Sequence, residues 1–296
     1  MGGTSRQRYG LNRPSWFEER IYGVSMQSDL SEELATAERA AREAGSTIMA
    51  MFGKEYHIEE KSKGNPVTAA DFAANHKIQE IIQGRFPHDA WLSEESKDDL
   101  KRLSASRVWV IDPIDGTKEF IEGIPQFAVS IGLAIDSRPV LGVVYNPAQE
   151  KFYKAAAGLG ATLNGQPIRV SQRAEVAGAA LLVSRSEPRK RFQPFADLCR
   201  VQPIGSIAFR LALVAGGEGN GTLTFRSLRE WDVCAGVAIV EQAGGIVIDG
   251  EGERLTFNRR DTFCRGMVAA NPPLARSLHA MLTKALAGKL EPEPPR

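Results

Sequence analysis

The chain has 296 residues, of which 43% are hydrophobic and 25% are charged, a balance typical of a soluble globular protein with one large domain or two subdomains. Its 37 basic and 36 acidic side chains leave a formal charge of +1, which excludes a global electrostatic field for holding a nucleic acid polymer. The three cysteines are far apart in the sequence, which does not suggest a disulfide framework. The sequence contains no run of 18 apolar residues that would indicate a membrane span, and its first 28 residues lack a secretory signal. We therefore expect a cytoplasmic protein.

The first part of the chain is predicted to be helical. Between residues 30 and 51, apolar side chains recur at steps of three and four, which predicts one amphipathic helix. Asp29 and Glu32 resemble a capping box at its start, and Gly53 is a stop signal. A second helix is predicted from about residue 68 to residue 83.

Strands dominate the next part of the chain. A two-residue hairpin is indicated at Asn164-Gly165, between the segments ATL and QPIRV. Four apolar segments before it read as consecutive strands: VWVI (108–111), QFAVSIGLAI (126–135), PVLGVVY (139–145) and KFYKA (151–155).

Beyond residue 156 strands and helices alternate. Strands are predicted at ALLVS (180–184), TLTF (222–225), IVID (246–249) and GMVAA (266–270), and helices at SIAFRLALVA (206–215), WDVCAGVAIVEQA (231–243) and after Pro273. Helices, then antiparallel strands, then an alternating half predict a layered α+β protein with two subdomains. We place these subdomains at residues 29–155 and 156–288, between a flexible extension of residues 1–28 and a disordered tail of residues 289–296.

Two carboxylates lie in one tight corner, in the sequence WVIDPIDGT (109–117). Pro113 helps to end the strand, and Gly116 can adopt a backbone conformation closed to other residues. Asp112 and Asp115, both ionised, repel each other unless a cation lies between them, and carboxylates are ligands that Mg²⁺ prefers. An isolated pair of this kind also fits an ordinary turn in which both acids accept backbone N–H groups.

Further acids follow the ends of other predicted segments. Glu94 and Glu95 end a short apolar stretch, Asp71 is in the first turn of the second helix, and Asp232 opens a buried helix. Each also has an ordinary interpretation, as a solvated loop, a helix-start partner of Thr68 or an anion facing a helix dipole. Together they are acids at segment ends, where rigid scaffolds place ligands.

The motifs DPIDGT, the upstream EES and the downstream WDVCAG resemble the signature set of the inositol monophosphatase superfamily over roughly residues 30–285. Its members are magnesium-dependent, often lithium-sensitive phosphomonoesterases that occur as monomers or homodimers. The resemblance implies a layered α-β-α-β-α sandwich of the sugar-phosphatase type. It also implies a small phosphorylated metabolite as substrate and no membrane partner.

The same resemblance implies a set of metal ligands. Glu94, Asp112 and the backbone carbonyl of Ile114 would bind one Mg²⁺, and Asp112, Asp115 and Asp232 would bind a second one. Two ions about 3.5–4 Å apart can stabilise the attacking and leaving oxygens of an in-line displacement.

Catalytic and substrate contacts are implied by the family as well. The backbone N–H groups of Gly116 and Thr117 would bind the substrate phosphate, with Asp115 and Asp232 also at the substrate. The Thr117 hydroxyl, paired with Glu94, would orient and help to deprotonate the attacking water. Asp71 would support a third, weaker ion or its waters at the edge of the site.

The residues around these motifs favour one substrate. KEF (118–120) resembles the 3′(2′),5′-bisphosphate nucleotidases, whereas inositol-specific members tend to read TNF there and to carry an acid several positions before WD. Phe225 and the cationic Arg226, Arg229 or Arg210 suit adenine and an extra phosphate, although these arginines also fit a solvated surface. We therefore expect hydrolysis of 3′-phosphoadenosine 5′-phosphate. The alternatives are an inositol-1-monophosphatase, a broad sugar phosphatase, and an inactive relative that binds a phosphometabolite.

Overall fold

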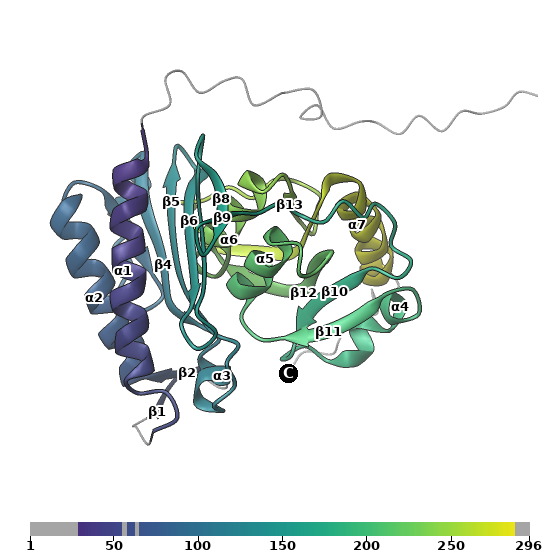
Figure 1. The fold of residues 1–296 in the computed structure, drawn as a ribbon, viewed down its shortest axis with the longest axis horizontal. Helices are drawn as coiled ribbons and strands as arrows, with labels where there is room; N and C mark the ends of the chain where they lie inside the picture. Colours follow the sequence, from purple (N-terminus) through teal and green to yellow (C-terminus); the bar gives the residue numbers. More distant parts are fainter. Residues whose placement is uncertain (1–28, 55–57, 63–64, 288–296) are drawn as a thin grey trace, which may run out of the picture.

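A computed structural model describes residues 29–54, 58–62 and 65–287. The extension predicted for residues 1–28 and the tail predicted for residues 289–296 lie outside the described residues. Helices and sheets alternate in five layers, helix, sheet, helix, sheet, helix, from one end of the molecule to the other (Figure 1). This arrangement confirms the predicted α-β-α-β-α sandwich.

The first layer contains α1 (Ser31–Met49) and α2 (Ala69–Arg85), which pack against each other and against the first sheet. Both helices confirm the predicted periodicity. The predicted capping box at the start of α1 is wrong, because Leu30 is the N-cap and Asp29 Oδ1 instead accepts the Ser31 N–H at 3.0 Å. A short antiparallel hairpin of β1 (Ile58–Ser62) and β2 (Asn65–Thr68) leads into α2.

The first sheet has seven strands in chain order, with β3 parallel to β4 and every other pair antiparallel. Its turn at Asn164 and Gly165 has φ values of 48° and 82°, which confirms the predicted hairpin. The strands are β3 (Ala90–Ser93), β4 (Arg107–Asp115), β5 (Ala128–Ile135), β6 (Arg138–Asn146), β7 (Lys151–Ala156), β8 (Gly160–Leu163) and β9 (Gln166–Pro167).

The second sheet has five strands in the order β11-β10-β12-β14-β13, and β10 is parallel to both of its neighbours. Its strands are β10 (Ala180–Ser184), β11 (Arg200–Ile204), β12 (Gly221–Arg229), β13 (Ile246–Asp249) and β14 (Phe263–Ala270). The middle layer between the sheets is formed by α5 (Ile207–Ala215) and α6 (Glu230–Gln242), and the outer layer by α4 (Gln193–Ala196) and α7 (Pro272–Ala287) (Figure 1). A short α3 (Thr117–Ile121) follows β4 directly.

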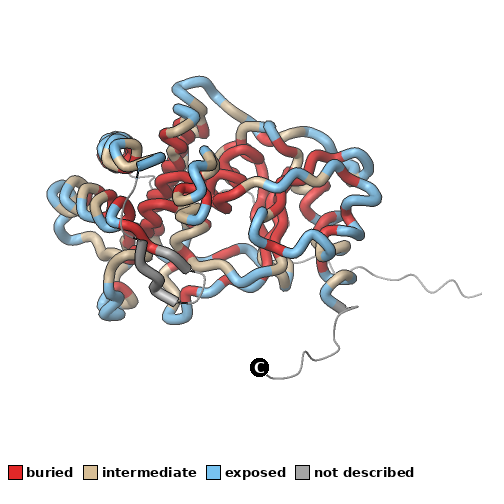
Figure 2. Tube along the Cα trace, turned by 90° about the horizontal axis from the view of Figure 1, so that it is seen from below, coloured by how far each residue is buried: buried red, intermediate tan, exposed pale blue. Residues whose placement is uncertain are grey.

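Both faces of the first sheet are buried, which explains why β4 reads as an unbroken apolar run. Trp109 and Ile111 pack in the core beneath α1 and α2, whereas Val108 and Val110 pack in the core shared with α5, α6 and the second sheet. Buried segments accordingly run through the centre of the molecule, and exposed ones lie on the outer helices and loops (Figure 2).

The sheet and α6 approach each other unusually closely. A Cβ atom on Gly142 of β6 would lie 2.1 Å from the Ala235 carbonyl oxygen of α6, so only glycine fits there. This contact fixes α6 against the strands that precede the site. Within the described parts of the chain, no helix combines the length and the apolar character needed to cross a membrane.

Candidate active site

Three carboxylates from distant segments converge at one edge of the middle layer. Oxygen atoms of Glu94, Asp112 and Asp232 all lie within 4.8 Å of one another. Glu94 directly follows β3, and its N–H donates to the Ile111 carbonyl at 3.1 Å. Asp112 is in β4, and Asp232 is in the first turn of α6. The segments that carry the predicted ligands therefore meet.

The corner between Asp112 and Gly116 is irregular. The pairing of β4 with β5 shifts register between Asp112 and Asp115, and the Ile114 N–H donates to Asp112 Oδ1 at 3.0 Å. Gly116 has the left-handed φ of 97° that the sequence predicts, and a Cβ there would lie 3.0 Å from the Gln126 carbonyl oxygen. Strand pairing continues to Asp115, beyond the predicted strand VWVI (108–111).

Asp115 is the last residue of β4, and its side chain contacts the start of α5. Its Oδ2 atom accepts hydrogen bonds from the Ser206 hydroxyl and the Ala208 N–H, both at 2.6 Å. Burial raises the pKa of Asp115 to about 6, although these two hydrogen bonds and the nearby Arg210 act to lower it. Asp115 is outside the group of three acids, but its charge acts on both Asp112 and Asp232.

The converging acids repel one another strongly. Burial, followed by the charges of Glu94 and Asp115, raises the pKa of Asp112 well above its usual range. Burial and the charge of Asp115 do the same to the pKa of Asp232. Such a set of oxygen ligands fits a hard divalent cation, whose charge would offset both the burial and the repulsion.

Thr117 and Asp71 form the polar edge of the cluster. The Thr117 hydroxyl lies 3.1 Å from Asp71 Oδ1 and 3.0 Å from the Ile114 carbonyl oxygen. The other Asp71 oxygen accepts from the Thr68 N–H at 2.8 Å and from the Thr68 hydroxyl at 2.7 Å, which completes a capping box. The packing of α2 beside β4 brings Asp71 to this hydroxyl, and the joint role of Thr117 and Glu94 at an attacking water stays a prediction.

The predicted substrate-side residues differ in their surroundings. The ring of Phe225 packs against Phe192 and Phe195, with ring centres 5.6 Å and 6.2 Å apart, and Arg226 is exposed. The guanidinium of Arg229 stacks on Phe263, 3.4 Å from the ring centre. Arg229 is therefore engaged by a neighbouring side chain.

Arg210 is only 3% exposed, and burial lowers its pKa to about 10. Its Nη1 atom donates to Thr222 Oγ1 at 3.3 Å, whereas Nε has no hydrogen-bond partner among the described residues. A protonated guanidinium with unused donors therefore lies near Asp115, whose charge acts on it.

Two residues of this region were missed by sequence reasoning. Ser206 was seen only as the entry to a helix, although the Gly-Ser pair that opens it was a usable signal for the bond to Asp115. Glu187, which is 3% exposed, accepts from the Phe225 N–H at 3.1 Å and from the Thr224 hydroxyl. No motif surrounds Glu187, so the sequence contains no signal for it.

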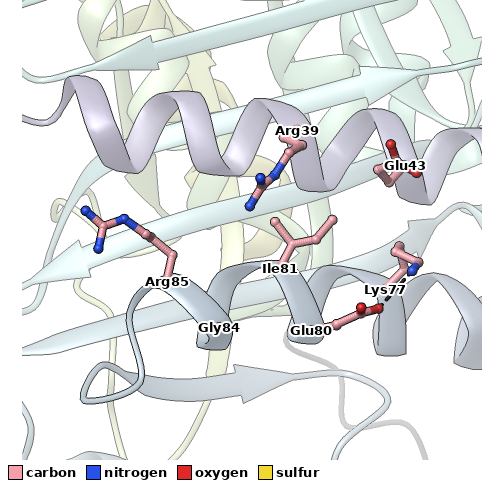
Figure 3. Close-up of a pocket in the computed structure, with 7 residues that line it drawn as sticks. All are labelled: Arg39, Glu43, Lys77, Glu80, Ile81, Gly84 and Arg85. Carbon is pink, nitrogen blue, oxygen red and sulfur yellow. Dashed lines mark hydrogen bonds and ion pairs between the residues drawn. The ribbon is translucent and has the colours of Figure 1, made fainter.

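A hollow lies on the outer face, between α1 and α2 (Figure 3). Charged side chains dominate it, and Lys77 pairs with Glu80 at 2.8 Å. None of the predicted site residues lines it. The lining residues are Arg39, Glu43, Lys77, Glu80, Ile81, Gly84 and Arg85.

Comparison with known proteins agrees with the site. The family model of the inositol monophosphatase family matches residues 29–291. The chain belongs to the inositol monophosphatase family. It is 40% identical over 234 residues to the inositol-1-monophosphatase of Synechocystis, covering 76% of this chain and 81% of the relative. It is 34% identical over 272 residues to the Nus factor SuhB of Escherichia coli, covering 87% of this chain and 98% of the relative.

Solved structures of the family share the fold. The Thermotoga maritima IMPase superposes with a TM-score of 0.78 at 28% identity, covering 87% of this chain and 99% of that one. The inositol monophosphatase from Anabaena gives 0.72 at 33% identity, covering 88% of this chain and 97% of that one. The chain is therefore a phosphomonoester hydrolase of a metal-dependent family, as the resemblance of its motifs indicates.

Proposed function

We propose that the protein is a Mg²⁺-dependent phosphatase whose best substrate is 3′-phosphoadenosine 5′-phosphate. The convergence of Glu94, Asp112 and Asp232 within 4.8 Å supports the metal dependence. Asp115 and the Ile114 carbonyl complete the proposed ligand set for two or three ions. When bound, these ions supply Lewis-acid chemistry that neutralises charge on the phosphate oxygens.

The protein's own groups then position the nucleophile and the phosphate. The Thr117 hydroxyl donates to Asp71 Oδ1 at 3.1 Å, so its oxygen is left to accept a hydrogen bond from the attacking water. Asp71 is the proposed base, reached through Thr117. At the start of α3, the Phe120 N–H donates to the Gly116 carbonyl and is the first backbone N–H to bond within the helix. The N–H groups before it have no partner within the helix, so those of Gly116 and Thr117 are proposed to bind the substrate phosphate.

The substrate preference rests on charge. Arg210, with donors unused, and the exposed Arg226 lie close enough to influence each other, and residues 225–229, before WD, contain no acid. Two cations favour a substrate that carries a second phosphate over a neutral polyol. Arg226, with Phe225 beside it, is the proposed contact to the 5′-phosphate and the adenosine.

A second candidate substrate is inositol 1-phosphate. It is favoured by the 40% identical relative named as an inositol-1-monophosphatase. Packing of the half-buried Phe225 ring against Phe192 and Phe195 also limits the face that could stack on adenine.

A substrate panel separates these possibilities. Phosphate release is measured with Mg²⁺, and again with a chelator, from 3′-phosphoadenosine 5′-phosphate, 3′-adenosine monophosphate, inositol 1-phosphate and a hexose phosphate. We expect the bisphosphate to give the highest kcat/KM, and Arg226→Met to lower that value without changing the value for 3′-adenosine monophosphate. A clear preference for inositol 1-phosphate would establish the second candidate. Equal rates of phosphate release with Mg²⁺ and with the chelator would contradict the metal dependence.

A further inference from the structure

We propose that Asn258, with Arg102 and Glu230, is a positioning unit that fixes the Glu94 segment relative to Asp232. The proposal rests on the metal-binding role proposed above for Glu94 and Asp232. The three side chains form a polar network between the loop after Glu94 and the first turn of α6, and none of them belongs to the predicted site. They connect segments more than 150 residues apart in the chain.

Arg102 connects the network to the loop that follows Glu94. It lies in the 3₁₀ turn Lys101–Ser104 that ends the loop after Glu94, and its side chain is only 2% exposed. Its Nε and Nη2 atoms donate to Asp98 of the same loop, at 2.8 Å for the shortest contact. The Nη1 atom donates across to Asn258 Oδ1 at 2.9 Å and to the Arg259 carbonyl at 3.0 Å.

Asn258 returns two hydrogen bonds to the same loop. Its side-chain N–H₂ group donates to the Arg102 carbonyl at 2.9 Å and to the Ala105 carbonyl at 3.2 Å. Four hydrogen bonds therefore join the segments, and three of them use the Asn258 side chain. Asn258 has a φ of 63°, a left-handed conformation that asparagine tolerates better than most residues do.

Glu230 connects this network to the helix that carries Asp232. It is the first residue of α6, is fully buried, and accepts from the Asn258 N–H at 2.7 Å and from the Arg259 N–H at 3.0 Å, one on each oxygen. A buried carboxylate is costly unless it is hydrogen-bonded in this way. Glu230 thereby ties residues 258 and 259 to the first turn of α6, two residues before Asp232.

This connection matters because the acids it supports repel one another. Without such support, Glu94 and Asp232 would lower their repulsion by moving apart, which widens the site for a small cation. Mg²⁺ tolerates little variation in its ligand distances, so residues that hold the ligands in place commonly affect metal affinity about 10- to 100-fold.

The test compares Asn258→Gly with Asn164→Gly in the full chain. Both residues have positive φ, and both side chains bridge backbone groups, since Asn164 accepts from the Phe152 N–H at 2.9 Å and donates to the Glu150 carbonyl at 3.0 Å. Asn164 lies in the β8–β9 hairpin, so its replacement controls for the loss of an asparagine side chain at a turn. The readouts are Mg²⁺ binding by calorimetry, the rise in Tm on adding Mg²⁺, and the Mg²⁺ dependence of phosphate release.

We expect Asn258→Gly to weaken Mg²⁺ binding about tenfold or more, with kcat largely recovered at saturating Mg²⁺, and Asn164→Gly to stay within about twofold of the unaltered protein. Equal Mg²⁺ affinities in the two variants would overturn the positioning role alone. Failure of the unaltered protein to bind Mg²⁺ would overturn the proposed function and this inference together.

A second pair of variants covers the case in which Asn258→Gly does not fold. Glu230→Gln keeps the volume of the side chain, leaves one of two backbone N–H groups without its acceptor and removes the ion pair with Arg259, whose Nε lies 3.3 Å from Glu230 Oε1. Glu241→Gln, near the other end of the same helix, is the matched control, because Glu241 also pairs with an arginine, Arg254, at 3.7 Å. A tenfold loss of Mg²⁺ affinity in Glu230→Gln alone supports the proposal, and an unchanged affinity refutes it.

Discussion

Asp71 uses its two oxygens for two different purposes, so Asp71→Asn separates them. Oδ2 caps α2 through Thr68, and Oδ1 accepts from the Thr117 hydroxyl at 3.1 Å. In the variant, the amide oxygen should remain with the Thr68 N–H, because that buried donor requires an acceptor. The amide N–H₂ group then faces Thr117, which reverses the polarity of the second hydrogen bond and removes the proposed base.

The two effects differ in size. Loss of a negative charge in the first turn of α2 costs about 0.3–1 kcal/mol of stability, because the capping hydrogen bonds are kept. Loss of a positioned base typically lowers turnover by about 10²–10⁴, which corresponds to about 3–5 kcal/mol in the activation free energy. The effect on catalysis should therefore exceed the effect on folding several-fold.

Steady-state phosphate release at saturating Mg²⁺ and substrate measures the first quantity, and thermal unfolding of the metal-free protein measures the second. Glu80→Gln, at an exposed position on the same helix, is the control and should change neither. A kcat for Asp71→Asn within threefold of the unaltered protein would refute the role of Asp71. A loss of kcat that additional Mg²⁺ restores would show that Asp71 acts through metal binding instead.

Three further outcomes are expected from the geometry. Asp112→Asn should abolish turnover yet raise the Tm of the metal-free protein. In the unaltered protein the folded-state pKa of the Asp112 carboxyl is raised, so ionising this group in the fold costs stability as pH rises. The gain in Tm of the variant should therefore grow with pH, and a lower Tm at neutral pH would contradict this. Gly142→Ala should cost about 1–3 kcal/mol or more in denaturant unfolding, because its Cβ would lie 2.1 Å from the Ala235 oxygen, whereas Gly84→Ala, with nothing within 4 Å, should cost none. Burial raises the pKa of Cys264 to about 11, so only about one thiol in a thousand is ionised at pH 8, and iodoacetamide should label it slowly until urea unfolds the chain; rapid native labelling would disprove its burial.

The main elements and the acid motif could be predicted because their signals are local. The helix periodicity, the Asn-Gly turn and the glycine after DPID depend on neighbouring residues, and the structure contains all three. The short strands β1, β2 and β11 contain polar residues or proline, and they depend on pairing partners that periodicity does not reveal.

The partner of Thr117 could not be predicted in the same way. Asp71 is 46 residues away, and only the packing of α2 against β4 decides that its Oδ1 meets the hydroxyl. Glu187 and Asn258 are isolated polar residues without a surrounding pattern, and Glu230 precedes WDVCAG without any sign of its partners. Their importance follows from burial and from hydrogen bonds to distant segments, which are properties of the folded chain.

The middle layer also constrains how the molecule can come apart. Because α5 and α6 supply apolar side chains to a core shared by both sheets, neither sheet can expose its inner face without uncovering these helices as well. Either half produced alone would expose a large apolar surface to solvent, so the separate halves should aggregate rather than fold. Melting of the whole chain should follow a single cooperative transition despite its length.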